Sequence, residues 1–141
     1  MTRDIEYFDR IIEKNPLDAT AHYSRGLAHL ALGNYVKANL DVEKSFILGL
    51  NTTEVRTALG YTRLKVNMVP NAWTVRNELA EWQIGIGLYD KALANLERSL
   101  DITGLSTESP PALLLKGRAL RGLDRFDEAL ATLKQGVLIG G

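Results

Sequence analysis

Apolar residues recur along the chain at the 3.6-residue spacing of an α-helix, and no apolar run alternates in the manner of a half-buried strand. In residues 3–14, for example, Ile5, Phe8 and Ile12 share one helical face, and the Asn15-Pro16 dipeptide ends the helix. Together with the turn residues, the spacing predicts eight helices and no strand, at about 3–14, 19–32, 35–48, 53–66, 70–86, 89–102, 110–122 and 126–139. The chain is therefore expected to be all-α.

Residues between the predicted helices are suited to begin and end them. Asp18 can cap the second helix by accepting a hydrogen bond from an otherwise unpaired amide. Gly33 starts a turn, and Gly49 ends the helix that follows it. Pro110 suits the first turn of a helix, where no amide hydrogen is needed, and Asp124 is expected to cap the last helix.

One short pattern occurs three times. LGNYVKA at 32–38 returns as IGLYDKA at 86–92 and, with a change at the turn, as LDRFDEA at 123–129. Gly26 and Gly60 lie thirty-four residues apart, although glycine inside a helix costs about 1 kcal/mol relative to alanine. Self-similarity at a fixed interval indicates a repeat architecture in which each glycine has a packing reason.

The segment 19–52 resembles one tetratricopeptide repeat, a pair of antiparallel helices with small residues at positions eight, twenty and twenty-seven of a 34-residue unit. Here those positions are Gly26, Ala38 and Ser45. The resemblance extends over nearly the whole chain and implies a helix-pair array, an α-solenoid, in a single domain. Its parts are a half unit at 3–16, a unit at 19–52, a helix at 53–66, a shared helix at 70–86, a unit end at 89–102 and a unit at 110–139.

The resemblance also implies which residues meet where paired helices approach most closely. Glycine at position eight lets the backbones approach, at Gly26, Gly60 and Gly117. Small residues face it from the second helix, at Ala38, Ala92 and Ala129. An aromatic ring is expected to fill the space beside each turn, at Tyr35, Tyr89 and Phe126.

The register of the repeat breaks after the helix at 53–66. The helix at 70–86 fits as the second helix of the unit that begins at Thr53, and equally as the first helix of the unit that contains IGLYDKA. Either a helix has been lost or one helix serves both units. We therefore expect a bent or compact array and not a smooth superhelix.

Composition excludes several classes of function. Seventeen basic residues balance seventeen acidic ones, so no charge excess favours nucleic acid or an anionic membrane. No apolar run reaches the roughly 18–20 residues that span a bilayer, and the charged N-terminus lacks the apolar core of a signal peptide. A cytoplasmic location is the default expectation, with a periplasmic or lumenal one open if a leader was removed. The absence of cysteine excludes disulfides.

A search for chemistry yields no catalytic constellation. His22 and His29 are seven residues apart on one helix, roughly 10.5 Å, which is too far to share a metal. Both fall where aromatic side chains usually pack, so they are expected to be buried or half-buried histidines. The lone G-x-G at 85–87 lacks the residues of a phosphate-binding loop. We expect no enzyme activity, no metal and no cofactor.

In arrays of the family it resembles, the first helix of each unit lines a concave groove for a partner. Carried onto this chain, the candidate groove residues are Tyr23, Leu27, Leu30, Tyr61, Leu64, Asn77, Glu81, Arg118 and Arg121. An apolar half with tyrosines therefore precedes a charged half with arginines, and both residue types are favoured interface anchors. The basic and asparagine clamp that some members use for a terminal carboxylate is absent, because Tyr23 and Leu27 occupy its positions. Alternatively, the broken register folds the apolar half against later helices of the chain.

The leading hypothesis is a non-enzymatic adaptor or scaffold that holds an extended segment or a helix of a partner protein. A narrower version is a small chaperone of the same repeat class that shields apolar segments of its cargo. The alternative is a self-associating piece of a longer array, because the chain starts on a half unit and its last helix lacks a polar capping helix. In that case the face with Val137 and Leu138 would be covered by a second copy or by a continuation of the chain.

Overall fold

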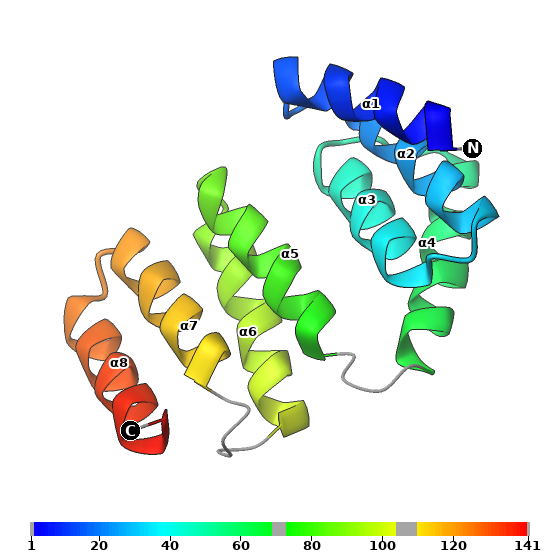
Figure 1. Ribbon diagram of the computed structural model, residues 1–141. Helices are drawn as coiled ribbons and strands as arrows, with labels where there is room; N and C mark the ends of the chain where they lie inside the picture. The colour runs from blue at the N-terminus through cyan, green and yellow to red at the C-terminus, as the bar shows by residue number, and fades with distance from the viewer. Residues whose placement is uncertain (1, 69–72, 104–109, 141) are drawn as a thin grey trace. The chain divides into compact units, whose positions relative to one another are not determined.

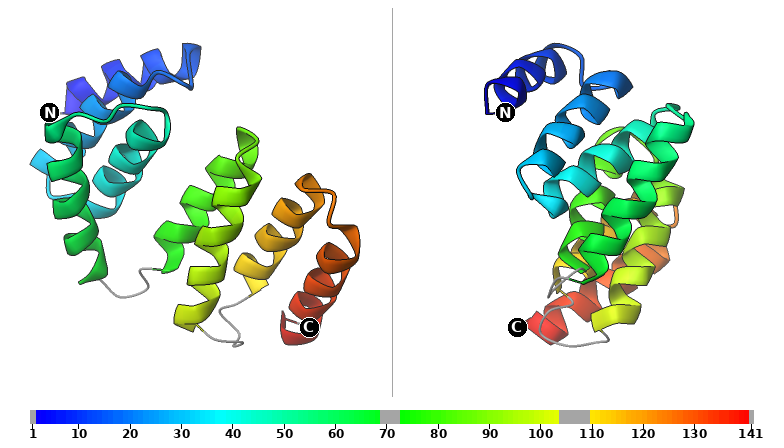
Figure 2. Two further views of the ribbon diagram at one scale, coloured as in Figure 1. Left: turned by 180° about the vertical axis from the view of Figure 1, so that it is seen from behind. Right: turned by 90° about the vertical axis from the view of Figure 1, so that its right-hand side faces the viewer.

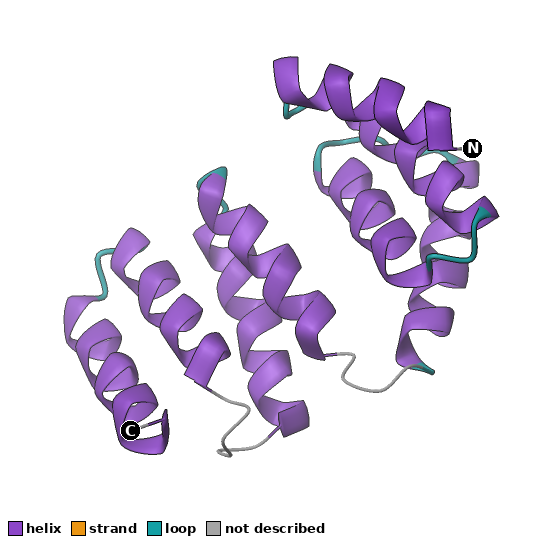
Figure 3. Ribbon diagram, viewed as in Figure 1, coloured by secondary structure: helices purple, strands orange, loops and turns teal. Residues whose placement is uncertain are grey.

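The computed structural model describes residues 2–68, 73–103 and 110–140. Within these ranges the chain forms eight α-helices and no strand (Figures 1 and 3), which confirms the predicted all-α class. The helices are α1 (Thr2–Lys14), α2 (Ala19–Ala31), α3 (Tyr35–Ile47), α4 (Thr53–Asn67), α5 (Trp73–Gly85), α6 (Tyr89–Thr103), α7 (Pro110–Gly122) and α8 (Phe126–Gly140). The predicted start of the fifth helix at Pro70 lies outside the described residues.

Helix ends follow local turn chemistry. The Asp18 carboxylate accepts a hydrogen bond from the Ala21 amide at 3.0 Å, as predicted. Gly33 and Gly87 take the left-handed conformation in the turns before α3 and α6, with φ of 78° and 83°. Asp124 occupies the corresponding turn before α8 with φ of 60°, so the prediction that it caps this helix is wrong. Arg125 is the residue that flanks α8, since its carbonyl accepts from the Ala129 amide.

Contacts between Cα atoms divide the chain into two compact units, Met1–Ala72 (unit 1) and Trp73–Gly141 (unit 2). The division falls within the segment where the repeat register breaks. In unit 1, α2 and α3 form an antiparallel pair, α1 packs on α2, and α4 packs on α3 (Figure 1). In unit 2, α5 pairs with α6 and α7 with α8, while α7 also contacts both α5 and α6 (Figure 2). Within unit 2, α5 thus takes the place of a first helix.

The core of unit 1 contains apolar side chains of α3 and α4. Val42, Val55, Ala58 and Leu59 form a buried cluster, and Tyr23 of α2 packs against it. Polar contacts hold the same helices together. Asn39 donates to the Thr62 hydroxyl at 3.2 Å in the buried contact, and Arg63 pairs with Glu43 at 2.6 Å nearer the surface.

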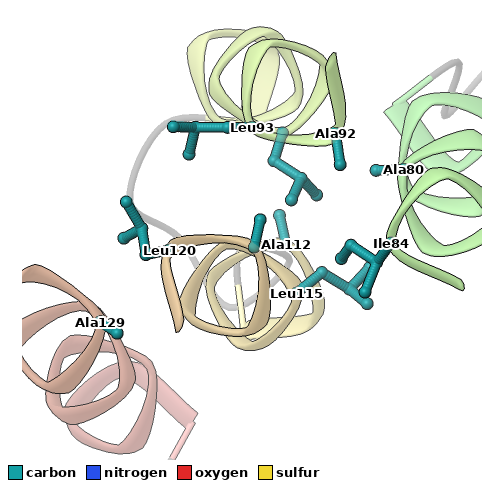
Figure 4. Packing of buried hydrophobic residues seen from close by; sticks show 10 residues of the cluster. Ala80, Ile84, Ala92, Leu93, Ala112, Leu115, Leu120 and Ala129 are labelled. Atoms are coloured by element: carbon teal, nitrogen blue, oxygen red, sulfur yellow. The ribbon is translucent and has the colours of Figure 1, made fainter. Parts of the chain in front are cut away.

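The core of unit 2 is a larger apolar cluster. Figure 4 shows side chains of α5, α6 and α7 meeting in its interior, with Ala129 joining from α8. Its buried members are Ala80, Ile84, Ala92, Leu93, Leu96, Ala112, Leu115, Ala119, Leu120 and Ala129. Ala38 is fully buried in unit 1, so all three predicted second-helix alanines are core residues.

Close approach of paired helices accounts for two of the three predicted glycines. A Cβ atom on Gly26 would lie 3.2 Å from the Ala38 carbonyl oxygen, and one on Gly117 would lie 2.6 Å from the Leu133 side chain. The same expectation is wrong for Gly60, where a Cβ would meet no described atom within 4 Å. The reason is that α4 packs on α3 through the side chains around Ala58 and not through its glycine face.

The predicted aromatic rings beside the turns behave differently from one another. The Lys65 ammonium of α4 lies 5.4 Å from the centre of the Tyr35 ring, and the Tyr89 ring packs against Gly122 at the end of α7. Phe126 is 59% exposed, so the prediction that it is buried is wrong. The rings of Tyr35 and Tyr89 each pack on the last turn of the helix that begins the next pair, α4 and α7 respectively. In the described chain no helix follows α8 to cover Phe126 in the same way.

Candidate interaction surfaces

The apolar part of the predicted groove lies on α2 and α4 of unit 1. Tyr23 is half-buried against the core of that unit, and burial together with the nearby Glu54 carboxylate raises the pKa of its phenol. Leu27, one turn farther along α2, is 40% exposed, and Leu30 is partly exposed. Tyr23 therefore has a structural role as well as an exposed edge, whereas Leu27 is open to solvent.

An apolar stripe runs along the exposed face of α4. Tyr61 is 45% exposed, Leu64 is 61% exposed, and Met68 follows at the end of the helix. The Lys65 ammonium lies 5.5 Å from the centre of the Tyr61 ring and 5.4 Å from that of the Tyr35 ring, so one cation contacts the faces of two rings. Tyr61 and Leu64 are one turn apart and project from the same side of the helix.

The charged part of the predicted groove lies on α5 and α7 of unit 2. Glu81, Arg118 and Arg121 are exposed, as a binding surface requires. Asn77 is not part of this surface, which corrects its assignment. Its side chain is buried and its carbonyl oxygen accepts a hydrogen bond from the Ser99 hydroxyl at 2.8 Å, so it joins α5 to α6.

The sequence did not reveal a buried ionic cluster at the contact of α2 with α3. Asp41 accepts two hydrogen bonds from the Arg25 guanidinium, at 2.8 and 2.7 Å. A third guanidinium nitrogen donates to Asp9 of α1 at 2.9 Å. The two histidines flank the same Asp41 carboxylate, with ring nitrogens 3.6 Å away for His22 and 4.0 Å away for His29. We refer to these five residues as the Asp41 cluster.

Burial and charge act in opposite directions on the acid–base groups of the Asp41 cluster. Burial alone would raise the pKa of Asp41, but the hydrogen bonds from Arg25 and His22 and the Arg25 charge together lower it. Burial lowers the pKa of His29 and outweighs the opposing attraction of Asp41. The bond to Asp41 raises the pKa of Arg25. The cluster is therefore arranged for a carboxylate, a guanidinium and a neutral His29 near pH 7.

A cleft of about 280 Å³ opens next to the Asp41 cluster between α1, α2 and α3. Its lining consists of Ile5, Asp9, Arg25, His29, Lys37, Leu40, Asp41 and Lys44. The prediction that both histidines are buried or half-buried is confirmed, but their position around one carboxylate was not predicted. The available signal was the twelve-residue spacing of His29 and Asp41, which matches that of Gln83 and Asn95, a pair joined at 2.8 Å in unit 2.

Two family models described as tetratricopeptide repeat match the chain at residues 5–44 and 110–139. This chain is a tetratricopeptide repeat protein. Similar solved structures include YrrB, described as a TPR protein with an unusual peptide-binding site, at 19% identity, 98% coverage of this chain, 77% coverage of that chain and a TM-score of 0.44. Another is MamA, at 18% identity, 94% and 84% coverage and a TM-score of 0.41. No curated protein sequence matches the chain.

Tetratricopeptide repeats are protein–protein interaction modules that are typically not enzymes, and the fold of this chain supports an interaction role in general. In the described part of the chain, no group of three or more histidine, aspartate or glutamate side chains is placed to hold a metal ion. None of the helices searched there combines the length and apolar character that crossing a membrane requires.

Proposed function

We propose that this tetratricopeptide repeat protein is a non-enzymatic adaptor that holds an extended segment or a helix of a partner protein on unit 1. The observation that carries this proposal is the exposed apolar surface of its first helices, with Leu27 on α2 and Tyr61 and Leu64 on α4. Exposed apolar side chains that share one helix face are typical of interaction sites. A partner's apolar side chain would dock beside Tyr61, since tyrosine supplies a large and rigid contact.

The exposed charges of unit 2 form a separate candidate contact for a partner protein. Arg118 and Arg121 lie nearly one turn apart on α7, and both side chains are exposed. Arginine can bind a carboxylate through two parallel hydrogen bonds, so an acidic residue of the partner is the expected contact there. Glu81 on α5 adds a carboxylate that would favour a basic neighbour in the partner.

Replacement of Tyr61 by alanine together with Leu64 by serine tests the proposal. A photo-crosslinker at position 64 would first identify the partner segment, whose affinity is then measured by calorimetry. Loss of a buried aromatic anchor typically costs about 2 kcal/mol, or roughly thirtyfold in affinity. The helical signal should remain, because both side chains are exposed in the free protein.

Leu17→Ser is the matched control, since Leu17 is a comparably exposed leucine in the connection before α2. Tyr23→Ala is expected to reduce both affinity and stability, because its ring also contacts the core. Equal partner affinity of the Tyr61/Leu64 double variant and the parent would overturn the assignment of this surface.

A second candidate function, self-association, is favoured by an observation on α8. Leu130 and Val137 correspond in the repeat to Leu93 and Leu100 of α6, which pack in the core beside α7. On α8 these positions are 55% and 70% exposed, and Leu138 is exposed beside them. The face of α8 that corresponds to the α6 surface packed beside α7 is therefore open. Sedimentation should show a concentration-dependent dimer that Val137→Glu with Leu138→Glu converts to a monomer; a monomeric parent at high concentration excludes it.

A further inference from the structure

The first helix α4 differs from the others in having no second helix packed along it within unit 1. The other described first helices are paired, α2 with α3, α5 with α6 and α7 with α8, whereas no described helix of unit 1 follows α4 (Figure 1). Position eight is Gly26 in α2 and Gly117 in α7, and Gly60 occupies it in α4. A Cβ on Gly60 would meet no described atom within 4 Å, so the equivalent face of α4 is open.

The open side of α4 carries apolar side chains beside its glycine. Leu64 and Met68 follow Gly60 by one and two turns, and both are largely exposed. Glycine at this place costs about 1 kcal/mol in helix propensity relative to alanine, and no helix of unit 1 uses the space that it leaves. We refer to Arg56, Gly60, Leu64 and Met68 as the Gly60 face.

The α2–α3 pair shows which charge a helix on this face would carry. In that pair, ring nitrogens of His22 and His29 of α2 lie 3.6 and 4.0 Å from the Asp41 carboxylate of α3. Thirty-four residues later, the same two positions of α4 are Arg56 and Arg63. An arginine binds a carboxylate through charge-assisted hydrogen bonds, so an acidic residue at the Asp41 position of a covering helix would suit α4.

Arg56 supplies the positive charge of the Gly60 face. Its guanidinium donates to the carbonyl and side-chain oxygens of Asn51, at 3.1 and 3.0 Å, and to the Thr53 hydroxyl at 3.4 Å, which are all neutral groups. Glu54 is two residues away along α4, and residues at that separation do not face each other on a helix. The contacts of Arg56 therefore leave its charge unbalanced.

The other two cations of α4 already have partners. Arg63 donates two hydrogen bonds to the Glu43 carboxylate of α3, at 2.9 and 2.6 Å. The Lys65 ammonium lies over the rings of Tyr35 and Tyr61. The Gly60 face thus combines one unbalanced cation, a glycine that permits close approach and two exposed apolar side chains.

We infer that the Gly60 face binds an amphipathic α-helix of the partner protein, which takes the place of the second helix that α4 lacks. This helix has a small residue against Gly60 and, three residues later, an acidic residue that pairs with Arg56. Ala38 and Asp41 of α3 have this spacing, and both lie against Gly26 of α2. The inference rests on the proposed function and narrows its partner to a helix, the binding mode in which apolar anchors recur every three or four residues.

The test uses the intact chain and two helix-stabilised synthetic peptides with the sequence of residues 88–102. One has the parent sequence and the other carries Asn95→Asp, because Asn95 is the α6 residue at the position of Asp41, and Ala92 precedes it by three. Calorimetry measures affinity, and nuclear magnetic resonance of the labelled chain should map both peptides to amides around Gly60. The Asn95→Asp peptide should bind about two- to fivefold more tightly, the range of a partly exposed ion pair.

Two variants of the chain separate the glycine from the charge. Gly60→Leu should weaken both peptides by at least about tenfold, because leucine fills the space that the small residue enters. The variant should remain folded, since a Cβ there meets no described atom. Gly85→Leu is the matched control, because Gly85 is a helical glycine of α5 with equally open surroundings, and it should leave binding unchanged. Arg56→Gln should abolish the difference between the two peptides.

Several results would overturn the inference. They are no binding of either peptide at α4, equal affinities of the two peptides for the parent chain, unchanged binding to Gly60→Leu, or a preference for the Asn95→Asp peptide that survives Arg56→Gln. A concentration-dependent dimer of the parent that Gly60→Leu abolishes would also overturn it, since the occupant would then be a second copy.

The proposed function fails by a different result, namely a partner segment whose affinity is unchanged in the Tyr61/Leu64 double variant. A segment that requires Tyr61 and Leu64 but binds Gly60→Leu as tightly as the parent would leave the proposed function standing. It would remove the helix from the Gly60 face.

Discussion

The α2–α3 pair of unit 1 and the α5–α6 pair of unit 2 have the same repeat design but different side chains in their contact. Counted from Ala19 and Trp73, His29 and Gln83 are both position eleven, and Asp41 and Asn95 are both position twenty-three. In unit 2 these positions hold a neutral hydrogen bond of 2.8 Å. In unit 1, position twenty-three is the Asp41 carboxylate, which the Arg25 guanidinium and the two histidine rings surround.

The α7–α8 pair gives a third solution at the same place. Leu120 and Thr132 occupy these positions, and Leu120 belongs to the apolar core. The repeat therefore specifies helix spacing, and the same contact tolerates leucine with threonine, a neutral amide pair, or the ionic contact that Asp41 makes with Arg25. The ionic version is the one most sensitive to the loss of a partner, because an uncompensated buried charge costs far more than a lost neutral hydrogen bond.

Asp41→Ala should show the largest difference between the two pairs. It leaves the Arg25 guanidinium, bonded to a buried carboxylate in the parent, without its two-point partner, at a cost of about 3–5 kcal/mol in unfolding free energy. Asn95→Ala removes a neutral bond and should cost about 1–3 kcal/mol. Urea unfolding measures both, and hydrogen exchange should place the Asp41 effect in α1 to α3. Equal costs would show that the ionic contact has no special weight.

Replacing the position-eight glycines by leucine should affect stability differently, depending on whether the glycine lies at a close contact with a second helix. Gly26→Leu and Gly117→Leu force α2 from α3 and α7 from α8, at a cost of typically 1–3 kcal/mol or more. Gly60→Leu meets no neighbour and should be stabilising by roughly 0.5–1 kcal/mol through helix propensity. Thermal unfolding of the three variants is the measurement. A loss of stability in Gly60→Leu would mean that the open face of α4 is covered.

Replacing the aromatic residue beside the turn by alanine should cost more stability where a further helix packs on its ring. Tyr89 packs against the core of unit 2 and the end of α7, so Tyr89→Ala should cost about 1–2 kcal/mol, less than for a fully buried ring. Phe126→Ala should change stability by no more than about 0.5 kcal/mol, since its ring is mostly exposed. If Phe126→Ala were the more costly of the two, another surface would cover α8 in solution.

The smallest expected effect is a dependence on pH that only unit 1 should show. The folded state lowers the pKa of His29, so between that value and the unfolded value near 6.5 the unfolded chain binds more protons. Stability from this group is complete above about pH 6.5 and is lost as pH falls toward the folded pKa. Asp41, whose pKa is also lowered, adds a separate loss at more acidic pH, below the unfolded value of about 3.9.

His29→Gln should flatten the change in unfolding free energy between pH 7.5 and 5.5, measured by urea titration at each pH. Glutamine is a suitable replacement, because Gln83 occupies the same repeat position in α5. Unit 2 contains no histidine and provides the comparison through hydrogen exchange of α5 and α6 at the same pH values. A parent protein whose unit 1 is equally stable at both pH values would refute this account.

The binding surface shows how far sequence reasoning extends at the level of single residues. Leu27, Tyr61 and Leu64, which repeat position assigns to the groove, are exposed in the structure, because each lies away from its own packing stripe. The same rule failed at Asn77, where a serine on the facing helix draws the amide into the contact. Repeat position indicates the side of its own helix from which a side chain projects. The hydrogen-bonding partner of that side chain comes from another helix.

By itself the sequence determined the eight helices of the described chain, the glycine turns at Gly33 and Gly87 and the buried alanines opposite each first helix, since spacing and backbone preference act within a few residues. Only the tertiary structure decided that Arg25 and the two histidines meet Asp41 and that Gly60 has an open face. These contacts depend on how one helix is rotated and offset against the next. That offset results from the packing of all side chains in the pair, so no single spacing along the chain encodes it.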